Sequence, residues 1–357
     1  MRIGIFDPYL DTLSGGEKYM LSIASCLSSK HSIFIFWDKK MEVEIKQGIL
    51  RKLGMDLSNI KFYKNIFSPH VSFLSRFIES RKFDAIVYLS DGSIPFIGTK
   101  LYIHFQFPIE WINGKSLKTK FKLLFVKKIF CNSYFTKFFV DKKLNIESQV
   151  LYPPVDINKV INVKKENVIL SVGRLDVDKH ENNYKKQDVM IKVLKKMIDE
   201  GLKDWKLILV IGVRSEDKNK LYKLEEMVKG YPIEIIENPS SQILWNCYSM
   251  AKIYWHATGF DENLEKYPEK AEHFGISTVE AMGAGSVPVV INAGGQKEIV
   301  QDGKNGYLWN TLEDCKKRTN DLIEDERLWK KMSNNAQERA NKFIGERFCR
   351  ELKEIIR

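Results

Sequence analysis

Two glutamates flank a run of small residues in the stretch AEHFGISTVEAMGAG, residues 271–285. Glu272 and Glu280 could hold the hydroxyl groups of a sugar, because an ionised carboxylate only accepts hydrogen bonds. Ser277 and Glu280 also match the S-x-x-E capping box, whose side chains satisfy the free N–H groups of a helix's first turn. The stretch alone leaves ligand binding and an ordinary helix start as alternatives.

Cationic side chains follow another apolar run of strand length. Arg174 comes directly after VILSVG (168–173), and Lys179, Lys185 and Lys186 lie in the loop that follows. A forked guanidinium and an ammonium group can together neutralise a diphosphate. A solvated basic loop is the alternative interpretation.

Two predicted helix starts could also receive an anion. Gly15 and Gly16 precede the amphipathic segment 17–29, so the backbone could approach a ligand closely and helix N–H groups would face it. Here too Ser14 and Glu17 spell S-x-x-E, so capping is the alternative.

The second predicted helix start lies between the two glutamates. Gly275, Ile276, Ser277 and Thr278 offer sterically accessible N–H groups there. The neighbouring carboxylates would repel a phosphate unless they face neutral groups such as sugar hydroxyls. The ligand that satisfies both requirements is a sugar joined to a nucleotide diphosphate.

These residues must be positioned by the elements around them. Short apolar runs alternate with longer amphipathic segments, which predicts an α/β architecture of parallel strands covered by helices. Strands are expected at 2–6, 32–37, 84–89, 101–105, 129–133 and 149–154, and again at 168–173, 206–213, 233–238, 252–257 and 287–294. Helices are expected over 17–29, 186–201, 240–251 and the charged tail 313–357.

The series of strands is interrupted once, at Pro153-Pro154 and the polar stretch 156–167. A length of 357 residues also suits two cores rather than one. We therefore expect two doubly wound domains, over 1–155 and 156–334, followed by a terminal helix over 335–357.

Composition excludes several classes of protein. Hydrophobic residues make up 44% and charged residues 29%, which is a globular composition. We find no signal peptide, no transmembrane stretch and no nucleic-acid-binding signature. Five scattered cysteines without a C-x-x-C pair predict a cytoplasmic protein with no disulfide and no structural zinc.

The net charge of +11 is densest in one segment. Residues 115–130 hold six lysines interleaved with Leu117, Phe121, Leu124 and Phe125. At helical spacing this gives an apolar stripe beside a basic face, which suits an anionic membrane surface through 115–128. Alternatively, the stripe packs on its own domain.

The motifs, taken together, resemble a known enzyme family. EHFGISTVEAMGAGSVPVV (272–290) resembles the E-x7-E signature of retaining glycosyltransferases of the two-Rossmann type, GT-B, family 4. GGEKY, NSYFTKFFVDK, VLYPPVD and SVGRL with KKQD also look like that family. The form of the segment 257–300 resembles its branch of lipid-linked oligosaccharide alpha-1,2-mannosyltransferases.

The resemblance implies two Rossmann-like domains facing across a cleft, with the terminal helix crossing back to the first. It assigns Glu280 to the ribose, Glu272 to the donor sugar, and Arg174 with Lys185 to the diphosphate. Backbone groups at Phe274, Gly275 and Ile276 would serve the sugar and phosphate, and Gly16 the phosphates. The other donor-binding candidates are Gly15 and Ser277, and His104 in YIHFQFP matches the family's acceptor-side histidine.

The resemblance implies a metal-independent transfer of a hexose, without a cofactor, from a UDP- or GDP-sugar to a glycan or lipid-linked hydroxyl. Between Arg174 and its lysine this chain carries a longer loop than the family usually has, so Lys185 and Lys179 both stay candidates for the diphosphate. Lys186 stands where the family usually has glycine. The alternatives are a nucleotide-sugar epimerase, a sugar phosphorylase and a non-catalytic scaffold that docks on membranes.

Overall fold

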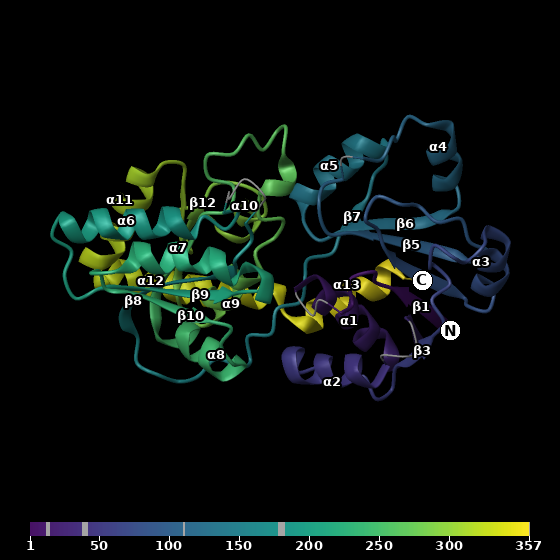
Figure 1. Cartoon of the computed structure of the whole chain (residues 1–357), viewed down its shortest axis with the longest axis horizontal. Coiled ribbons are helices and arrows are strands. Elements are labelled where there is room, and N and C mark those ends of the chain that lie inside the picture. The colour runs from purple at the N-terminus through teal and green to yellow at the C-terminus, as the bar shows by residue number, and fades with distance from the viewer. Residues whose placement is uncertain (12–14, 38–41, 110, 178–182, 357) are drawn as a thin grey trace. The chain divides into compact units, whose positions relative to one another are not determined.

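The computed structural model describes residues 1–11, 15–37, 42–109, 111–177 and 183–356. The chain divides into two compact units, Met1–Pro154 with Gly345–Arg357, and Val155–Ile344. Figure 1 shows a parallel sheet with helices on both faces in each unit. Lys179 and Ser14 lie outside the described residues.

The first unit is built on a seven-stranded parallel sheet in the order β3-β2-β1-β4-β5-β6-β7. Its strands are β1 (Arg2–Phe6), β2 (Ser32–Phe36), β3 (Lys61–Tyr63), β4 (Ala85–Leu89), β5 (Lys100–Phe105), β6 (Val126–Cys131) and β7 (Gln149–Val150). The central strands read as continuous apolar runs because both faces of the sheet are covered.

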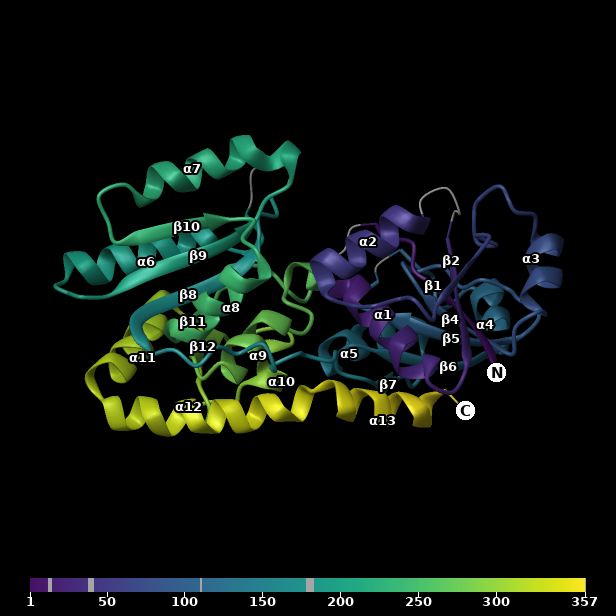
Figure 2. The same cartoon turned by 90° about the horizontal axis from the view of Figure 1, so that it is seen from below.

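The helices of the first unit divide between the two faces of the sheet. One hydrophobic cluster joins α1 (Gly15–Ser28), α2 (Glu42–Leu53) and the chain's last helix, α13 (Gly345–Ile355). A second cluster on the opposite face includes α5 (Tyr134–Leu144), while α3 (Phe73–Ser80) and α4 (Leu117–Leu123) are short peripheral helices. Figure 2 shows α13 running beside α1.

The second unit is built on a six-stranded parallel sheet in the order β10-β9-β8-β11-β12-β13. Its strands are β8 (Glu166–Arg174), β9 (Lys206–Gly212), β10 (Ile233–Glu237), β11 (Ala251–His256), β12 (Val287–Ile291) and β13 (Tyr307–Trp309). One face carries α6 (Gln187–Asp199), α7 (Lys218–Val228) and α11 (Leu312–Glu324), whose apolar side chains share a core with the sheet. The remaining helices are α8 (Ser241–Met250), α9 (Ile276–Gly283), α10 (Gln296–Ile299) and α12 (Glu326–Ala340).

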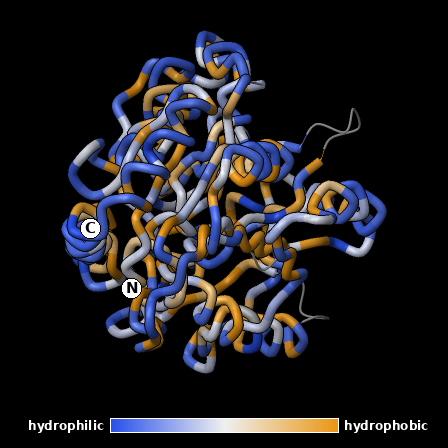
Figure 3. Tube along the Cα trace, turned by 90° about the vertical axis from the view of Figure 1, so that its left-hand side faces the viewer, coloured by the Kyte–Doolittle hydropathy of each residue, from blue (hydrophilic) through white to orange (hydrophobic). Residues whose placement is uncertain are grey.

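The predicted α/β fold of two parallel-sheet units is confirmed. Hydrophobic and hydrophilic stretches alternate along the chain trace in Figure 3. Two short strands, β3 and β13, escaped the sequence analysis because three residues give no periodic signal. The helix expected over 115–130 ends at Leu123, since residues from Val126 onward pair with β5 as strand β6.

The terminal helix expected over 335–357 is two separate elements. Helix α12 ends at Ala340, and a 3-10 turn over Asn341–Phe343 follows before α13 begins at Gly345. Helix α12 and the turn belong to the second unit, whereas α13 belongs to the first. Aromatic and aliphatic side chains of α13 lie in the core of the first unit.

The expectation of no disulfide is wrong in this structure. Cys26 of α1 and Cys349 of α13 form a disulfide, with their Cα atoms 5.4 Å apart. Nothing in the spacing signals this pair, because 323 residues separate the two cysteines. The cysteines therefore give no argument for a reducing compartment.

Among the described residues, no helix is both long and apolar enough to cross a membrane.

Candidate functional site

The carboxyl edge of the second sheet brings together the predicted residues of that unit. Strand β8 lies between β9 and β11, so the chain winds outward in opposite directions from this point. In open parallel sheets such a switch point leaves a crevice for ligands beyond the strand ends. Arg174 ends β8, Lys185 precedes α6, and Glu272 lies in the loop between β11 and α9.

Lys185 and Glu272 form an ion pair at this edge. Lys185 Nζ donates to Glu272 Oε2 at 2.7 Å, and both side chains are about one-fifth exposed. His256, the last residue of β11, places Nε2 3.0 Å from the same carboxylate oxygen. Its Nδ1 has no hydrogen-bond partner among the described residues. The pair is therefore held by a third side chain that the sequence analysis did not identify as functional.

Electrostatics fix the ionisation states of Glu272 and His256. Burial favours the neutral form of Glu272, but the Lys185 charge and the hydrogen bond from His256 hold the pKa of Glu272 well below its usual range. Burial lowers the pKa of His256, although the hydrogen bond to Glu272 and the charge of Glu272 act to raise it. The trio is thus a carboxylate, an ammonium and a neutral imidazole that donates through Nε2.

Arg174 is an exposed cation at this edge. Its side chain has no ion pair with any residue in the described ranges, whereas Lys185 is engaged by Glu272. The Arg174 carbonyl accepts a hydrogen bond from Gln187 Nε2 at 3.1 Å, which ties the end of β8 to the start of α6. A Cβ on Gly212 would lie 3.4 Å from Arg174 Cγ, so the arginine stem lies along the end of β9. With respect to the described residues, the guanidinium keeps its donors available for an anion.

The start of α9 differs from the capping-box alternative. Its N-cap is Gly275, at φ 119° and without a side-chain cap hydrogen bond, so Ser277 and Glu280 lie inside the helix. Ser277 Oγ accepts from Tyr254 OH at 2.8 Å, and Glu280 Oε2 accepts from Tyr248 OH at 2.9 Å. The two side chains are therefore held by buried tyrosines of β11 and α8 at positions inside the helix.

A glycine pair after β12 supports the backbone of the site. The Gly295 N–H donates to the Glu272 carbonyl at 2.7 Å. A Cβ on Gly294 would lie 2.3 Å from that carbonyl oxygen, and one on Gly295 would lie 2.4 Å from Phe274 Cα. No larger residue fits this close approach. Phe274 itself is buried, next to Ile276 and the helix start.

A second ion-pair cluster joins the same two loops. Glu262 accepts from Lys186 and from Lys270, each at 2.7 Å. Lys186 has a left-handed backbone with φ 55°, a conformation that glycine adopts without strain. Its ion pair with Glu262 gives the lysine a structural role at a position where the family usually has glycine.

In the first unit, Gly15 and Gly16 open α1 as predicted. Gln106, which directly follows β5, donates from Nε2 to the Gly16 carbonyl at 3.0 Å. A Cβ on Gly16 would lie 2.5 Å from Gln106 Oε1, so a larger residue here would displace the Gln106 side chain. The sequence analysis had passed over Gln106, which lies two residues beyond His104.

His104 lies in the core of the first unit. Its ring is fully buried, stacked 4.1 Å from Tyr19 and 4.6 Å from Phe130, measured between ring centroids. Nδ1 lies 3.1 Å from the Phe130 carbonyl, and burial lowers the pKa of His104 to about 3. Tyr19 of α1 covers one face of the ring, and an acceptor-side role for His104 stays a prediction.

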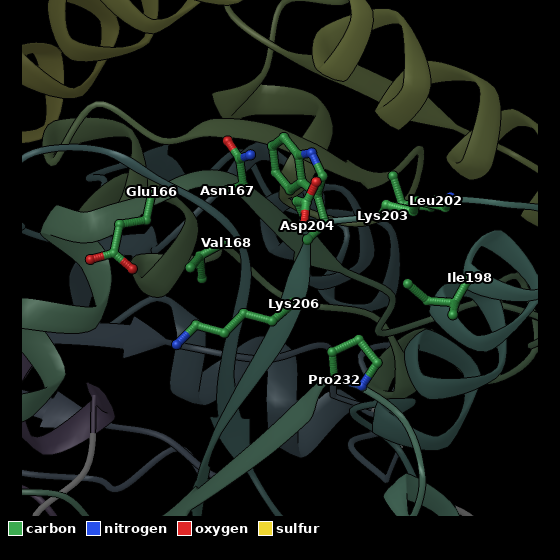
Figure 4. A pocket seen from close by; sticks show the side chains of 10 residues that line it. Glu166, Asn167, Val168, Ile198, Leu202, Lys203, Asp204, Lys206 and Pro232 are labelled. Carbon is green, nitrogen blue, oxygen red and sulfur yellow. The ribbon is translucent and has the colours of Figure 1, made fainter.

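The second unit also has a hollow away from this edge (Figure 4). It has a volume of about 570 Å³ and is lined by the first residues of β8 and β9, including Glu166 and Lys206. Those residues lie at the amino ends of the strands. The hollow is therefore at the opposite edge of the sheet from Arg174 and Glu272.

Comparison with known proteins decides the family. The family model described as "Glycosyl transferases group 1" matches residues 155–339, which include the whole carboxyl edge just described. The chain belongs to the glycosyl transferases group 1. It is a glycosyltransferase, and its family does not favour the epimerase, phosphorylase or scaffold alternatives.

Curated relatives of this glycosyltransferase include mannosyltransferases. The chain is 26% identical over 341 residues to alpha-1,3/1,6-mannosyltransferase ALG2 of Dictyostelium discoideum, covering 79% of this chain and 77% of that one. It is 25% identical to the "GDP-Man:Man(3)GlcNAc(2)-PP-Dol alpha-1,2-mannosyltransferase" of the same organism, but that alignment spans only 43% of the relative's length.

Solved structures share the fold over the full chain. The glycosyltransferase of Rickettsia africae matches with a TM-score of 0.74 at 18% identity, covering 100% of this chain and 98% of that chain. HepE of Anabaena, solved with UDP, matches with a TM-score of 0.75 at 17% identity, covering 100% and 99%. The predicted GT-B fold class is thereby confirmed.

Proposed function

We propose that this glycosyltransferase moves a hexose, with retention of anomeric configuration and without a metal ion, from a UDP- or GDP-sugar to a glycan or lipid-linked hydroxyl. The names of the mannosyltransferase relatives favour GDP-mannose as the donor and a diphosphate-linked lipid as the carrier of the acceptor. The observation that carries the proposal is that Arg174, Lys185 and Glu272 lie together at the carboxyl edge of the second sheet.

Arg174 and Lys185 supply the positive charge for the diphosphate. Lys185 need not leave Glu272 to do so, because an ammonium group has three N–H donors and only one is engaged by the carboxylate. The first N–H groups of α9 add partial positive charge beside the phosphates. Charge that develops on the departing nucleoside diphosphate is stabilised by these donors.

Glu272 holds the donor sugar, and Glu280 holds the ribose. Neighbouring side chains orient each carboxylate through one oxygen: Glu272 Oε2 accepts from Lys185 and His256, and Glu280 Oε2 accepts from Tyr248. Phe274, Gly275, Ile276 and Ser277 present backbone groups at the same helix start. His256 and the glycines of β12's loop position Glu272 but do not touch the donor.

Transfer proceeds on one face of the sugar. The acceptor oxygen forms a bond to the anomeric carbon as the bond from that carbon to the diphosphate oxygen breaks. The proton of the acceptor hydroxyl passes to the departing diphosphate, so no protein nucleophile is required. Arg174 and Lys185 receive the charge that the leaving group gains.

Turnover by the purified full chain tests the reaction. The protein is incubated with GDP-mannose or UDP-glucose and alkyl glycoside acceptors, and nucleoside diphosphate release is measured with and without EDTA. The expected results are release that EDTA does not reduce and a product whose anomeric configuration, read by NMR, equals that of the donor. An inverted product, or activity abolished by EDTA and restored by a metal, would overturn the corresponding part of the proposal.

A further inference from the structure

An exposed apolar surface covers α3, α4 and the loop between β4 and β5 in the first unit. We call it the aromatic surface. Its members are Phe73, Leu74, Phe77 and Ile78 of α3, Phe96 of the loop, and Leu117, Phe121, Leu124 and Phe125 in and just after α4. Leu117 and Leu124 are 83% and 80% exposed, and Phe73 and Phe121 are more than half exposed.

The rings of this surface form one continuous assembly. Phe96 lies at its centre, with its ring centroid 5.5 Å from Phe73, 5.8 Å from Phe77, 6.2 Å from Phe121 and 4.9 Å from Phe125. Helices α3 and α4 are thus joined by aromatic contacts although about 40 residues separate them in the chain. Both helices lie at the same end of the first unit in Figures 1 and 2.

The alternative that the stripe of α4 packs on its own domain holds only in part, through the ring contacts of Phe121 and Phe125 with Phe96. Helix α4 has no buried residue, and the predicted stripe of Leu117, Phe121, Leu124 and Phe125 is exposed along its length. Soluble proteins rarely expose a contiguous apolar patch of this kind unless it meets a membrane or a partner.

Positive charge surrounds the aromatic surface. Lys115, Lys118, Lys120 and Lys127 are exposed around α4, while Lys122 is partly buried and donates to the Ile94 carbonyl at 2.7 Å. The sequence from 111 to 140 contains no aspartate or glutamate. Interfaces between proteins are depleted in lysine, whereas lysines beside aromatic and leucine side chains suit anionic lipid headgroups.

We propose that the aromatic surface docks on an anionic lipid bilayer. Its phenylalanine and leucine side chains enter the boundary between headgroups and acyl chains, and the lysines around α4 contact the phosphates. The inference deepens the proposed function, because an acceptor on a lipid carrier would be met at this surface. The binding itself requires no sugar chemistry and can be tested separately.

Flotation of the full chain with lipid vesicles tests the proposal. Wild type is expected to float with phosphatidylcholine–phosphatidylglycerol vesicles, to float far less with pure phosphatidylcholine, and to be released by salt. The double variant Lys118→Gln/Lys120→Gln should weaken binding to anionic vesicles by about fivefold for each lysine removed. Leu117→Ser/Leu124→Ser should weaken it at least about tenfold, since two apolar side chains no longer insert.

Matched controls separate insertion from general charge and from misfolding. Lys330→Gln/Lys331→Gln removes two exposed lysines of the second unit and should leave flotation unchanged. Because the chain already has seven tryptophans, a Phe121→Trp variant is compared with wild type, and brominated acyl chains should quench its emission more strongly. Calorimetric binding of GDP-mannose should be equal in all variants, which shows that the site in the second unit is folded.

Three results would overturn the proposal. One is absence of wild-type binding to anionic vesicles. Another is binding of the leucine and lysine variants to anionic vesicles that is as strong as the binding of wild type. The third is a wild type that forms a dimer and does not bind vesicles, while Leu117→Ser/Leu124→Ser is a monomer. That result would assign the surface to a second copy of the chain. Vesicle binding without any binding of nucleotide sugars would leave the aromatic surface intact and reject the proposed function instead.

Discussion

At the scale of single residues, the ionisation of Glu272 sets the chemistry available at the site. Its carboxylate is poorly hydrated, yet Lys185 and His256 keep it charged. A charged acceptor can grip sugar hydroxyls strongly, whereas the cations beside it can hold phosphate. Glu272 is therefore expected to discriminate between a nucleotide sugar and the bare nucleoside diphosphate.

Replacing Glu272 by glutamine tests that discrimination. Glu272→Gln retains the shape but removes the charge, so affinity for GDP-mannose should fall by at least about tenfold relative to wild type. Affinity for GDP should fall far less, because Arg174 and Lys185 remain. Calorimetry of both ligands measures this, with Glu265→Gln, an exposed glutamate of the same loop, as the control. Equal losses for GDP and GDP-mannose would contradict the assignment.

Two buried groups of the first unit titrate in opposite senses. Burial lowers the pKa of His104 to about 3, so stability falls as pH drops below about 6.5, where the unfolded histidine binds a proton. Burial raises the pKa of Asp7 to about 7, so stability falls as pH rises from about 3.8 to 7. The two contributions cancel over their common range.

Single substitutions should reveal each contribution. In Asp7→Asn only His104 titrates of the two, so the free energy of unfolding should rise with pH. In His104→Asn only Asp7 titrates of the two, so the free energy of unfolding should fall with pH. Each slope has a limit of about 1.4 kcal/mol per pH unit. Pulse proteolysis in urea between pH about 4 and 6.5 measures both. Parallel pH profiles for the two variants would show that these groups do not titrate as described.

At the scale of elements, α9 begins without a capping side chain. Gly275 takes φ 119°. A Cβ there would lie 2.8 Å from Nε2 of the Gln296 side chain, which is fully buried. Both the backbone conformation and the packing therefore require glycine at this position.

Gly275→Ala is expected to destabilise the second unit by roughly 1–3 kcal/mol and to weaken donor binding. Gly230→Ala is the matched control, because Gly230 also has positive φ but an added Cβ would meet no atom within 4 Å. Only Gly275→Ala should reduce affinity for GDP-mannose in calorimetry. Equal effects of the two substitutions on that affinity would exclude a role for the start of α9.

The elements around the site were largely predictable, but their side-chain contacts were not. Apolar runs located β8, β11 and the helices that follow them, and the structure brings Lys185 and Glu272 together as expected. His256 ended a predicted strand without any signal of function, because a lone histidine has no pattern. Ser277 and Glu280 carried a genuine capping motif, but Tyr254 and Tyr248 of other elements engage them instead.

At the scale of the whole molecule, one covalent bond connects distant parts of the chain. The Cys26–Cys349 disulfide fixes α13 to α1 within the first unit. Phe348 and Leu352 of α13 are fully buried in the same core. Reduction is therefore expected to loosen α13 without unfolding the second unit.

Thiol titration and thermal unfolding test the disulfide. Wild type unfolded without reductant should expose three thiols, those of Cys131, Cys247 and Cys315. Cys349→Ser should cost roughly 2–4 kcal/mol and make the melting temperature of the first unit insensitive to dithiothreitol. Titration of five thiols in unreduced protein would contradict the bond.

The central claim is that a nucleotide sugar binds at the carboxyl edge of β8 and β11, and a calorimetric titration with GDP- and UDP-sugars tests it most directly. Wild type is expected to bind at least one of these nucleotide sugars. Arg174→Ala is expected to weaken that binding by at least about tenfold. The control Arg327→Ala, at an exposed arginine of α12, is expected to bind as wild type does. Absence of binding to every donor, or equal affinities for wild type and Arg174→Ala, would contradict the claim.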